Sequence, residues 1–179
     1  MTIERQLQAT IEAMVQKGKG ILAADESSPT IAKRFRAIGV ESTEAHRRGY
    51  RSLILATPGL GEFISGVILF EETLGQQADD GTPLPELVVR QGIVPGIKVD
   101  KGKLPLAHAP GDEITQGLDG LEQRLEGYKK QGARFAKWRD VYHISAVKPS
   151  RLAVEANAEV LARYAAICQA QGIVPIVEP

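Results

Sequence analysis

The protein has 179 residues, of which 43% are hydrophobic and 25% charged, and its formal net charge is zero. This profile is typical of one globular domain with its own core, and the balanced charge argues against a nucleic-acid-binding surface. A single cysteine, Cys168, excludes an intramolecular disulfide, and no apolar stretch approaches the roughly 18 residues of a membrane span, so we expect a cytoplasmic protein.

The chain begins with a predicted helix and continues with five short apolar runs. Ile3, Leu7 and Ile11 recur at helical spacing, and Gly18 ends this pattern. The runs that follow are hydrophobic without alternation, which is typical of strands buried on both faces of a parallel sheet. They cover residues 20–25, 66–71, 94–100, 134–139 and 173–178.

Helical patterns separate the predicted strands. An apolar stripe over 118–128 predicts one helix, and a longer helix is predicted over 154–168 with Ser150 as its N-cap. Segments 31–38 and 43–55 are also predicted helices. A helix followed by strand–helix units indicates an α/β protein with right-handed crossovers.

Two architectures accommodate five parallel strands. One is an open doubly wound sheet, and the other is part of a (β/α)₈ TIM barrel, which needs about 250 residues and eight strands. The apolar pattern alone favours the open sheet, because five strands cannot close a barrel. The long loops 75–92 and 101–117 are rich in Gly, Pro and Asp, and we interpret them as functional segments rather than simple connectors.

Charged residues lie at the ends of the predicted strands. Both architectures place ligand sites at the carboxyl ends of parallel strands, so these charges are candidates for a site assembled from several strands. For Glu71, Glu72 and Asp100, an equally good interpretation is the first solvated residue of a loop. The residues at the strand ends are Asp25, Glu71, Glu72, Asp100, Arg139 and Glu178.

Two lysines, Lys98 and Lys137, lie inside apolar runs. Burying an unpaired ammonium group costs several kcal/mol, so each lysine needs a counterion, and we expect Asp25 and Glu178 to serve. Lysines beside carboxylates suit imine formation with a carbonyl substrate, or the binding of phosphate or carboxylate. From residue chemistry alone, either lysine is a candidate nucleophile.

Other chemical signals are weak. His46, His108 and His143 lack metal-ligand spacing, and Cys168 lies on an apolar helix face, so we interpret all four as structural or surface residues. Trp138 is a predicted core residue. The glycine-containing segments match neither a P-loop nor a dinucleotide-binding motif, so the sequence predicts no metal and no nucleotide cofactor.

Six segments of the chain carry a resemblance to a known family. They are GKGILAADES, GVILFEETL, GIKVDKG, TQGLDGLEQR, YKKQGARFAKWR and NAEVLARYAAICQAQGIVPIVEP. In this order they resemble class I fructose-bisphosphate aldolases, from the first helix to the last residue. The resemblance implies a (β/α)₈ TIM barrel that reversibly cleaves fructose 1,6-bisphosphate into dihydroxyacetone phosphate and glyceraldehyde 3-phosphate. The reaction proceeds through a lysine Schiff base and uses no metal or other cofactor.

The resemblance implies a catalytic role for three residues. Asp25 would polarise substrate hydroxyls and assist C–C cleavage, and Lys137 would shuttle protons while the carbinolamine forms and dehydrates. Glu178 would be the general acid and base of Schiff-base formation and breakdown.

The resemblance also implies substrate-binding residues. Lys98 and Ser27 would bind the C6 phosphate, and Arg139 would contact the substrate. Many relatives have Thr-Gly-Ser where this chain has Ser28-Pro29-Thr30. The phosphate-binding hydroxyl of the last position is retained as Thr30, beside a loop that Pro29 stiffens.

Residues 1–179 are thereby expected to form the N-terminal part of a single aldolase barrel. The resemblance places the Schiff-base lysine on a sixth strand beyond Pro179, so we expect this chain alone to be inactive and to belong to a longer enzyme. The family tends to form tetramers, and we expect a homo-oligomer without nucleic-acid or membrane partners. The alternative is a catalytically silent barrel fragment that only binds a phosphorylated ligand or another protein.

Overall fold

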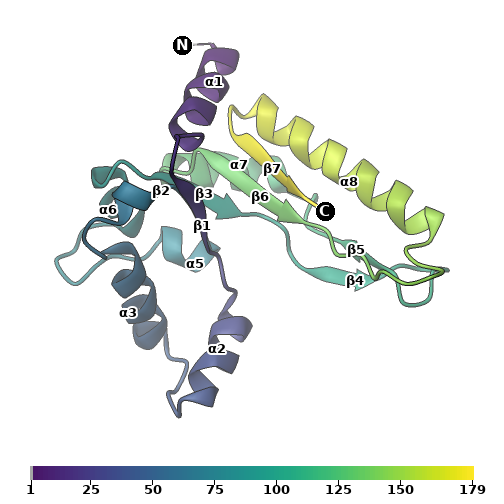
Figure 1. Cartoon of the computed structure of the whole chain (residues 1–179), viewed down its shortest axis with the longest axis horizontal. Coiled ribbons are helices and arrows are strands. Elements are labelled where there is room, and N and C mark those ends of the chain that lie inside the picture. The colour runs from purple at the N-terminus through teal and green to yellow at the C-terminus, as the bar shows by residue number, and fades with distance from the viewer. Residues whose placement is uncertain (1) are drawn as a thin grey trace.

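The computed structural model describes residues 2–179 and contains a five-stranded parallel sheet with helices packed around it (Figure 1). The strands lie side by side in chain order. A doubly wound sheet reverses its strand order at a switch point, so this order excludes the open-sheet alternative and fits part of a barrel. The strands are β1 (Gly20–Ala24), β2 (Ile64–Leu69), β3 (Val94–Lys98), β6 (Phe135–Arg139) and β7 (Val174–Glu178).

The long helices confirm the helical predictions. Ser150 is the N-cap of the longest helix, where its side chain accepts a hydrogen bond from the N–H of Ala153. The five helices are α1 (Ile3–Met14), α2 (Ser28–Ala37), α3 (Glu44–Leu55), α7 (Leu121–Lys130) and α8 (Arg151–Ala170).

The two long loops contain regular structure that the sequence did not predict. Segment 75–92 includes helix α6 (Leu84–Arg90), and segment 101–117 includes an antiparallel hairpin. Elements this short are marginal in isolation and form because of their tertiary contacts, so they leave a weak sequence pattern. The other short elements are α4 (Leu60–Phe63) and α5 (Glu71–Leu74), and the hairpin strands are β4 (Lys103–Pro105) and β5 (Glu113–Thr115).

The sheet is packed on both faces. The larger core, which includes the fully buried Trp138 and Tyr164, lies between the sheet and the helices. The smaller core packs Phe135 against Met14 of α1 on the other face. A Cβ atom at Gly96 would lie 2.3 Å from the Phe135 ring, so glycine makes room for this ring. This face is therefore filled beneath the carboxyl ends of the strands, where polar side chains remain.

The edge strands differ from the prediction of burial on both faces. The central strands β2, β3 and β6 are buried as expected, but Ile21 of β1 and Val177 of β7 are 41% and 46% exposed. The reason is that, within residues 2–179, β1 and β7 each have a strand neighbour on one side only. The same residues include no helix that is long and apolar enough to cross a membrane.

Candidate active site

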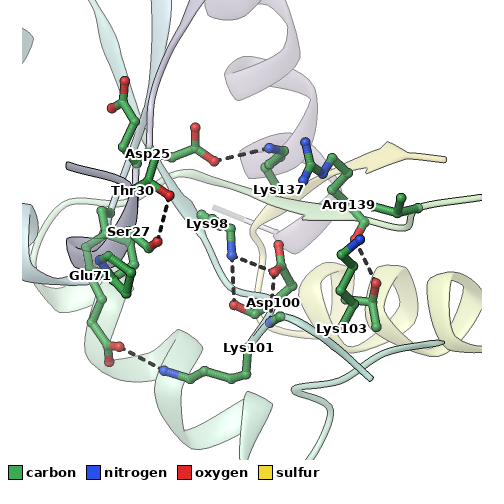
Figure 2. A pocket seen from close by; sticks show the side chains of 16 residues that line it. Asp25, Ser27, Thr30, Glu71, Lys98, Asp100, Lys101, Lys103, Lys137 and Arg139 are labelled. Carbon is green, nitrogen blue, oxygen red and sulfur yellow. Dashed lines mark hydrogen bonds and ion pairs between the residues drawn. The ribbon is translucent and has the colours of Figure 1, made fainter. Parts of the chain in front are cut away.

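A cavity of about 580 Å³ opens at the carboxyl ends of β1, β2, β3 and β6 (Figure 2). Acidic and basic side chains line it together, as expected for a site built from several strand ends. Every residue to which the resemblance assigns a catalytic or substrate-binding role lines this cavity except Glu178, which contacts the cavity residue Lys137. Its charged residues are Asp25, Glu26, Glu71, Lys98, Asp100, Lys101, Lys103, Lys137 and Arg139.

Lys137 lies between two carboxylates. Its Nζ is 3.1 Å from Oδ2 of Asp25 and 3.3 Å from Oε2 of Glu178, and its side chain is only 8% exposed. In a flat sheet, Asp25 after β1 and Lys137 on β6 would be about 14 Å apart, because neighbouring strands are spaced by about 4.8 Å. The contact therefore depends on the curl of the sheet. The sequence predicted both counterions of Lys137 correctly.

Lys98 is paired with a different carboxylate from the one predicted. It is the direct neighbour of Lys137 in the β3–β6 register, yet its Nζ binds Oδ1 of Asp100 at 2.5 Å and the Asp100 carbonyl at 3.1 Å. The expectation that Asp25 or Glu178 neutralises Lys98 is therefore wrong. Asp100 neutralises Lys98 instead, because it is only two residues away in the chain. Separate carboxylates thus offset the repulsion between two adjacent ammonium groups.

Hydroxyl groups meet the cavity at the start of α2. Ser27 is the N-cap of this helix, and its Oγ lies 3.1 Å from Oγ1 of Thr30 (Figure 2). Pro29 occupies the first turn, where its missing N–H removes no helical hydrogen bond. A helix N-terminus with two hydroxyls favours an anionic ligand, and Lys98 lines the same cavity.

Arg139 adds a cation that is not neutralised internally. Its side chain is exposed at the cavity wall and forms no salt bridge within residues 2–179. Lys101 and Lys103, which the sequence analysis missed, line the same wall and pair with Glu71 and Glu113 at 2.8 Å and 2.5 Å. The only sequence feature that could have indicated these two lysines is their position on either side of Gly102, directly after a predicted strand.

The two adjacent acids after β2 have different roles. Glu71 lines the cavity, and Lys101 holds the pKa of its carboxyl below the usual range. Glu72 instead binds Arg47 at 2.7 Å and also pairs with the buried Arg51. Hydrogen bonding to Arg47 lowers the pKa of Glu72 to about 2. Glu72 is thus a structural residue that joins α5 to α3.

Asp140 directly follows β6 and is 2% exposed. Trp138 Nε1 donates to its Oδ1 at 3.1 Å, and its Oδ2 has no hydrogen-bond partner within the described chain. Burial raises the pKa of this carboxyl. Asp140 was not predicted as a site residue, because an acidic residue after a strand shows the same sequence pattern whether it is buried or solvated.

The residues interpreted as structural or surface groups are placed as expected. Cys168 and Trp138 are fully buried, and burial raises the pKa of the Cys168 thiol to about 12. The three histidines, His46, His108 and His143, are exposed and belong to separate segments of the chain.

Comparison with known proteins gives one consistent family. Residues 6–179 match the family described as fructose-bisphosphate aldolase class-I. The whole chain is 58% identical to a probable fructose-bisphosphate aldolase class 1 of Xanthomonas campestris, covering 53% of that protein. Over 177 residues it is 58% identical to fructose-bisphosphate aldolase C of Carassius auratus, covering 98% of this chain and 49% of the relative.

A solved structure confirms the fold. A fructose-bisphosphate aldolase from Plasmodium falciparum, crystallised with TRAP and a small-molecule inhibitor, superposes with a TM-score of 0.96 at 51% identity. The match covers 99% of this chain and 52% of that one. The five strands and their helices are therefore part of a (β/α)₈ barrel. The chain spans about half the length of the curated relatives it matches.

Proposed function

This chain belongs to the class I fructose-bisphosphate aldolases, and from that premise we propose that the protein reversibly cleaves fructose 1,6-bisphosphate into dihydroxyacetone phosphate and glyceraldehyde 3-phosphate. The observation that carries the proposal is the ammonium group of Lys137 between the carboxylates of Asp25 and Glu178. We further propose that residues 1–179 are the N-terminal part of one barrel. The lysine that forms the Schiff base lies on a later strand, outside these residues.

Schiff-base chemistry needs groups that can add and remove protons at one place. Attack of an amine on the substrate carbonyl gives a carbinolamine, which must lose its hydroxyl as water to become an iminium. Lys137 and Glu178 are 3.3 Å apart and can exchange the required proton between them.

Cleavage of the C–C bond then needs a base at the opposite side of the substrate. Asp25 accepts the proton of the hydroxyl next to the breaking bond, and the bond electrons move into the iminium to form an enamine. The 3.1 Å contact to Lys137 keeps the Asp25 carboxylate oriented toward the cavity.

The substrate phosphates account for the remaining residues of the site. Ser27, Thr30 and the N-terminus of α2 provide hydrogen-bond donors for one phosphate, and Lys98 provides positive charge. Arg139 forms no salt bridge with any residue in the described part of the chain and is free to bind the substrate. Ketose bisphosphate and triose phosphates are thus the proposed ligands, and no metal or other cofactor takes part.

Intact-mass measurement tests the proposal. We expect the full-length protein, treated with fructose 1,6-bisphosphate and borohydride, to gain the mass of one reduced ketose-phosphate adduct, and a chelator to leave turnover unchanged. Peptide mapping should place the adduct outside residues 1–179. Absence of an adduct together with retained phosphate binding would instead support the catalytically silent alternative, and an adduct on Lys137 would contradict its role as a proton shuttle.

We also propose that the protein is a cytoplasmic homo-oligomer. A relative 53% identical to this chain is named a cytosolic aldolase of Arabidopsis thaliana, which supports this compartment. Light scattering of the full-length protein gives its subunit number, and a tetramer is the expected result. A monomer at working concentration would contradict the proposal.

A further inference from the structure

A buried amide on α8 holds the β4–β5 hairpin. The side chain of Asn157 is fully buried, and its Nδ2 donates to the carbonyls of Glu113 at 2.9 Å and Ala153 at 3.0 Å. Its Oδ1 accepts from the N–H of Thr115 at 3.4 Å. Both N–H groups and the oxygen of this amide therefore have hydrogen-bond partners. Two of the three partners, Glu113 and Thr115, belong to the same hairpin strand, β5.

The amide of Asn157 forms the backbone hydrogen bonds that a second strand beside β5 would otherwise form. In an antiparallel pair, alternate residues direct their backbone groups to the partner strand and the others direct theirs away. The carbonyl of Asp112 accepts from the N–H of Leu106 directly after β4, and Gln116 bonds to Lys101 and Gly102 directly before it. Glu113 and Thr115, which alternate with these residues, therefore face outward toward Asn157. Thr115 is 4% exposed, so water cannot easily replace the amide.

The hairpin carries much of the basic wall of the cavity. Lys103 pairs with Thr115 across the hairpin, and the N–H of Lys101 donates to the carbonyl of Gln116 at 2.8 Å. The Thr115 hydroxyl also donates to the carbonyl of Arg139 at 2.9 Å. Three cavity cations thus depend on β5 and on Gln116 directly after it, and Asn157 holds β5.

We propose that Asn157 is a positioning residue for phosphate binding. It fixes β5 on α8, and β5 in turn sets the direction of Lys101, Lys103 and Arg139 at the cavity wall. Asn157 contacts the cavity wall only through the backbone N–H of Thr115 and bonds to none of the cavity's charged side chains, so its effect is on ligand affinity rather than on proton transfer. The predicted effect on substrate binding rests on the proposed function, whereas the predicted effect on the hairpin does not.

Two variants of the full-length protein test the inference. Asn157→Leu removes both hairpin contacts at similar volume, and Asn157→Asp replaces the Nδ2 donor with an acceptor that faces the Glu113 carbonyl. Loss of one hydrogen bond should speed hydrogen exchange of the Thr115 N–H by about tenfold. Misplacement of the basic wall should raise KM for fructose 1,6-bisphosphate by about tenfold to 100-fold, with a much smaller change in kcat.

Ser65→Ala is the matched control. Ser65 is equally buried and donates to the carbonyls of Met14 and Gly20, at the opposite end of the sheet. It should lower thermal stability without changing Thr115 exchange or KM.

Titration with inorganic phosphate provides a readout that needs no turnover. Weaker phosphate binding in the Asn157 variants, but not in Ser65→Ala, supports the inference even if wild-type protein fails to cleave the sugar and the proposed function is lost. Unchanged phosphate affinity and KM with faster Thr115 exchange would overturn the positioning role. Unchanged Thr115 exchange would show that Asn157 does not hold the hairpin.

Discussion

At the scale of single residues, Lys137 has the most demanding environment in the site. Its ammonium group is nearly buried and is neutralised by carboxylates that come from the two edge strands. Removing it leaves two carboxylates facing each other, and the loss affects both proton transfer and the orientation of Asp25.

Substitution Lys137→Met should therefore abolish most of the activity of the full-length enzyme. We expect kcat to fall by about 10²- to 10⁴-fold, the usual contribution of a positioned acid or base, with a small change in KM. Steady-state kinetics checks this. Lys129→Met is the control, because Lys129 binds the Gln171 carbonyl at 2.7 Å and does not line the cavity, so its kcat should be unchanged.

Asp140 provides a residue-scale prediction on stability. Its folded pKa is raised by burial, so the folded state binds the proton more tightly than the unfolded state. The ionised carboxylate therefore destabilises the fold, fully so above the folded pKa and not at all below the unfolded value. Asp140→Asn should raise the free energy of unfolding by about 1 kcal/mol at pH 7.

The pH dependence of this gain separates it from a packing effect. Denaturant unfolding at pH 7 and near pH 4 should show the gain shrinking as the wild-type carboxyl becomes protonated. An equal gain at both pH values would contradict the electrostatic explanation.

Site residues could be predicted from the sequence where a charged side chain lies inside a short apolar segment that is expected to be buried. A lysine between Ala136 and Trp138 is unusual enough to single out Lys137 without any knowledge of the fold. Lys101 and Lys103 offered no such conflict, because lysines in a polar loop are ordinary. Their place at the cavity depends on the hairpin and on Asn157, which lies more than 40 residues away in the chain.

At the scale of elements, the Glu72 cluster ties α3 to the segment after β2. Arg51 is buried, pairs with Glu72 and Gln76, and stacks over the Phe70 ring at 5.5 Å. Because the Glu72 pKa is depressed, its stabilisation is present above the unfolded value near 4.5 and is lost as pH falls toward about 2.

We therefore expect Glu72→Gln to destabilise the protein strongly at neutral pH. The free energy of unfolding should fall by about 2 to 3 kcal/mol, because the guanidinium of Arg51 is left buried without a counterion. Chemical denaturation at pH 7 measures the change.

The control for this substitution is Arg48→Gln. Arg48 pairs with the exposed Asp79, and loss of a surface pair should cost less than about 1 kcal/mol. Equal effects of the two substitutions would contradict a special role for the buried cluster.

Element prediction succeeded where one apolar pattern was long enough to identify an element. The pattern over 154–168 and its cap at Ser150 predicted α8 correctly, and the five apolar runs predicted the sheet strands. It failed for α6 and the hairpin, whose three to seven residues are too few to show a period. It also could not distinguish edge from central strands, because that depends on strand order rather than on local composition.

At the scale of the whole molecule, the sheet has two open sides within residues 2–179. The edge strands β1 and β7 present backbone groups and exposed apolar side chains at these sides. Open edges of this kind promote association with other chains.

A polypeptide limited to residues 1–179 should therefore self-associate when it is expressed alone. Size-exclusion chromatography with light scattering should show species larger than the 19.4 kDa monomer. The double variant Ile21→Lys and Val177→Lys places charges on both edges and should shift the population toward monomer. A monodisperse monomer of the unaltered polypeptide would contradict the prediction.

The Asp25–Lys137–Glu178 contact also has a consequence for the time at which the site forms. Its members enter the ribosomal exit tunnel in the order carboxylate, lysine, carboxylate, and the last of them lies on β7. A nascent chain that already contains β1 to β6 holds Lys137 with one partner only. Lys137 gains its second carboxylate only after β7 has been synthesised and has packed against β6. During translation, most of the sheet therefore forms before the three charged groups are together.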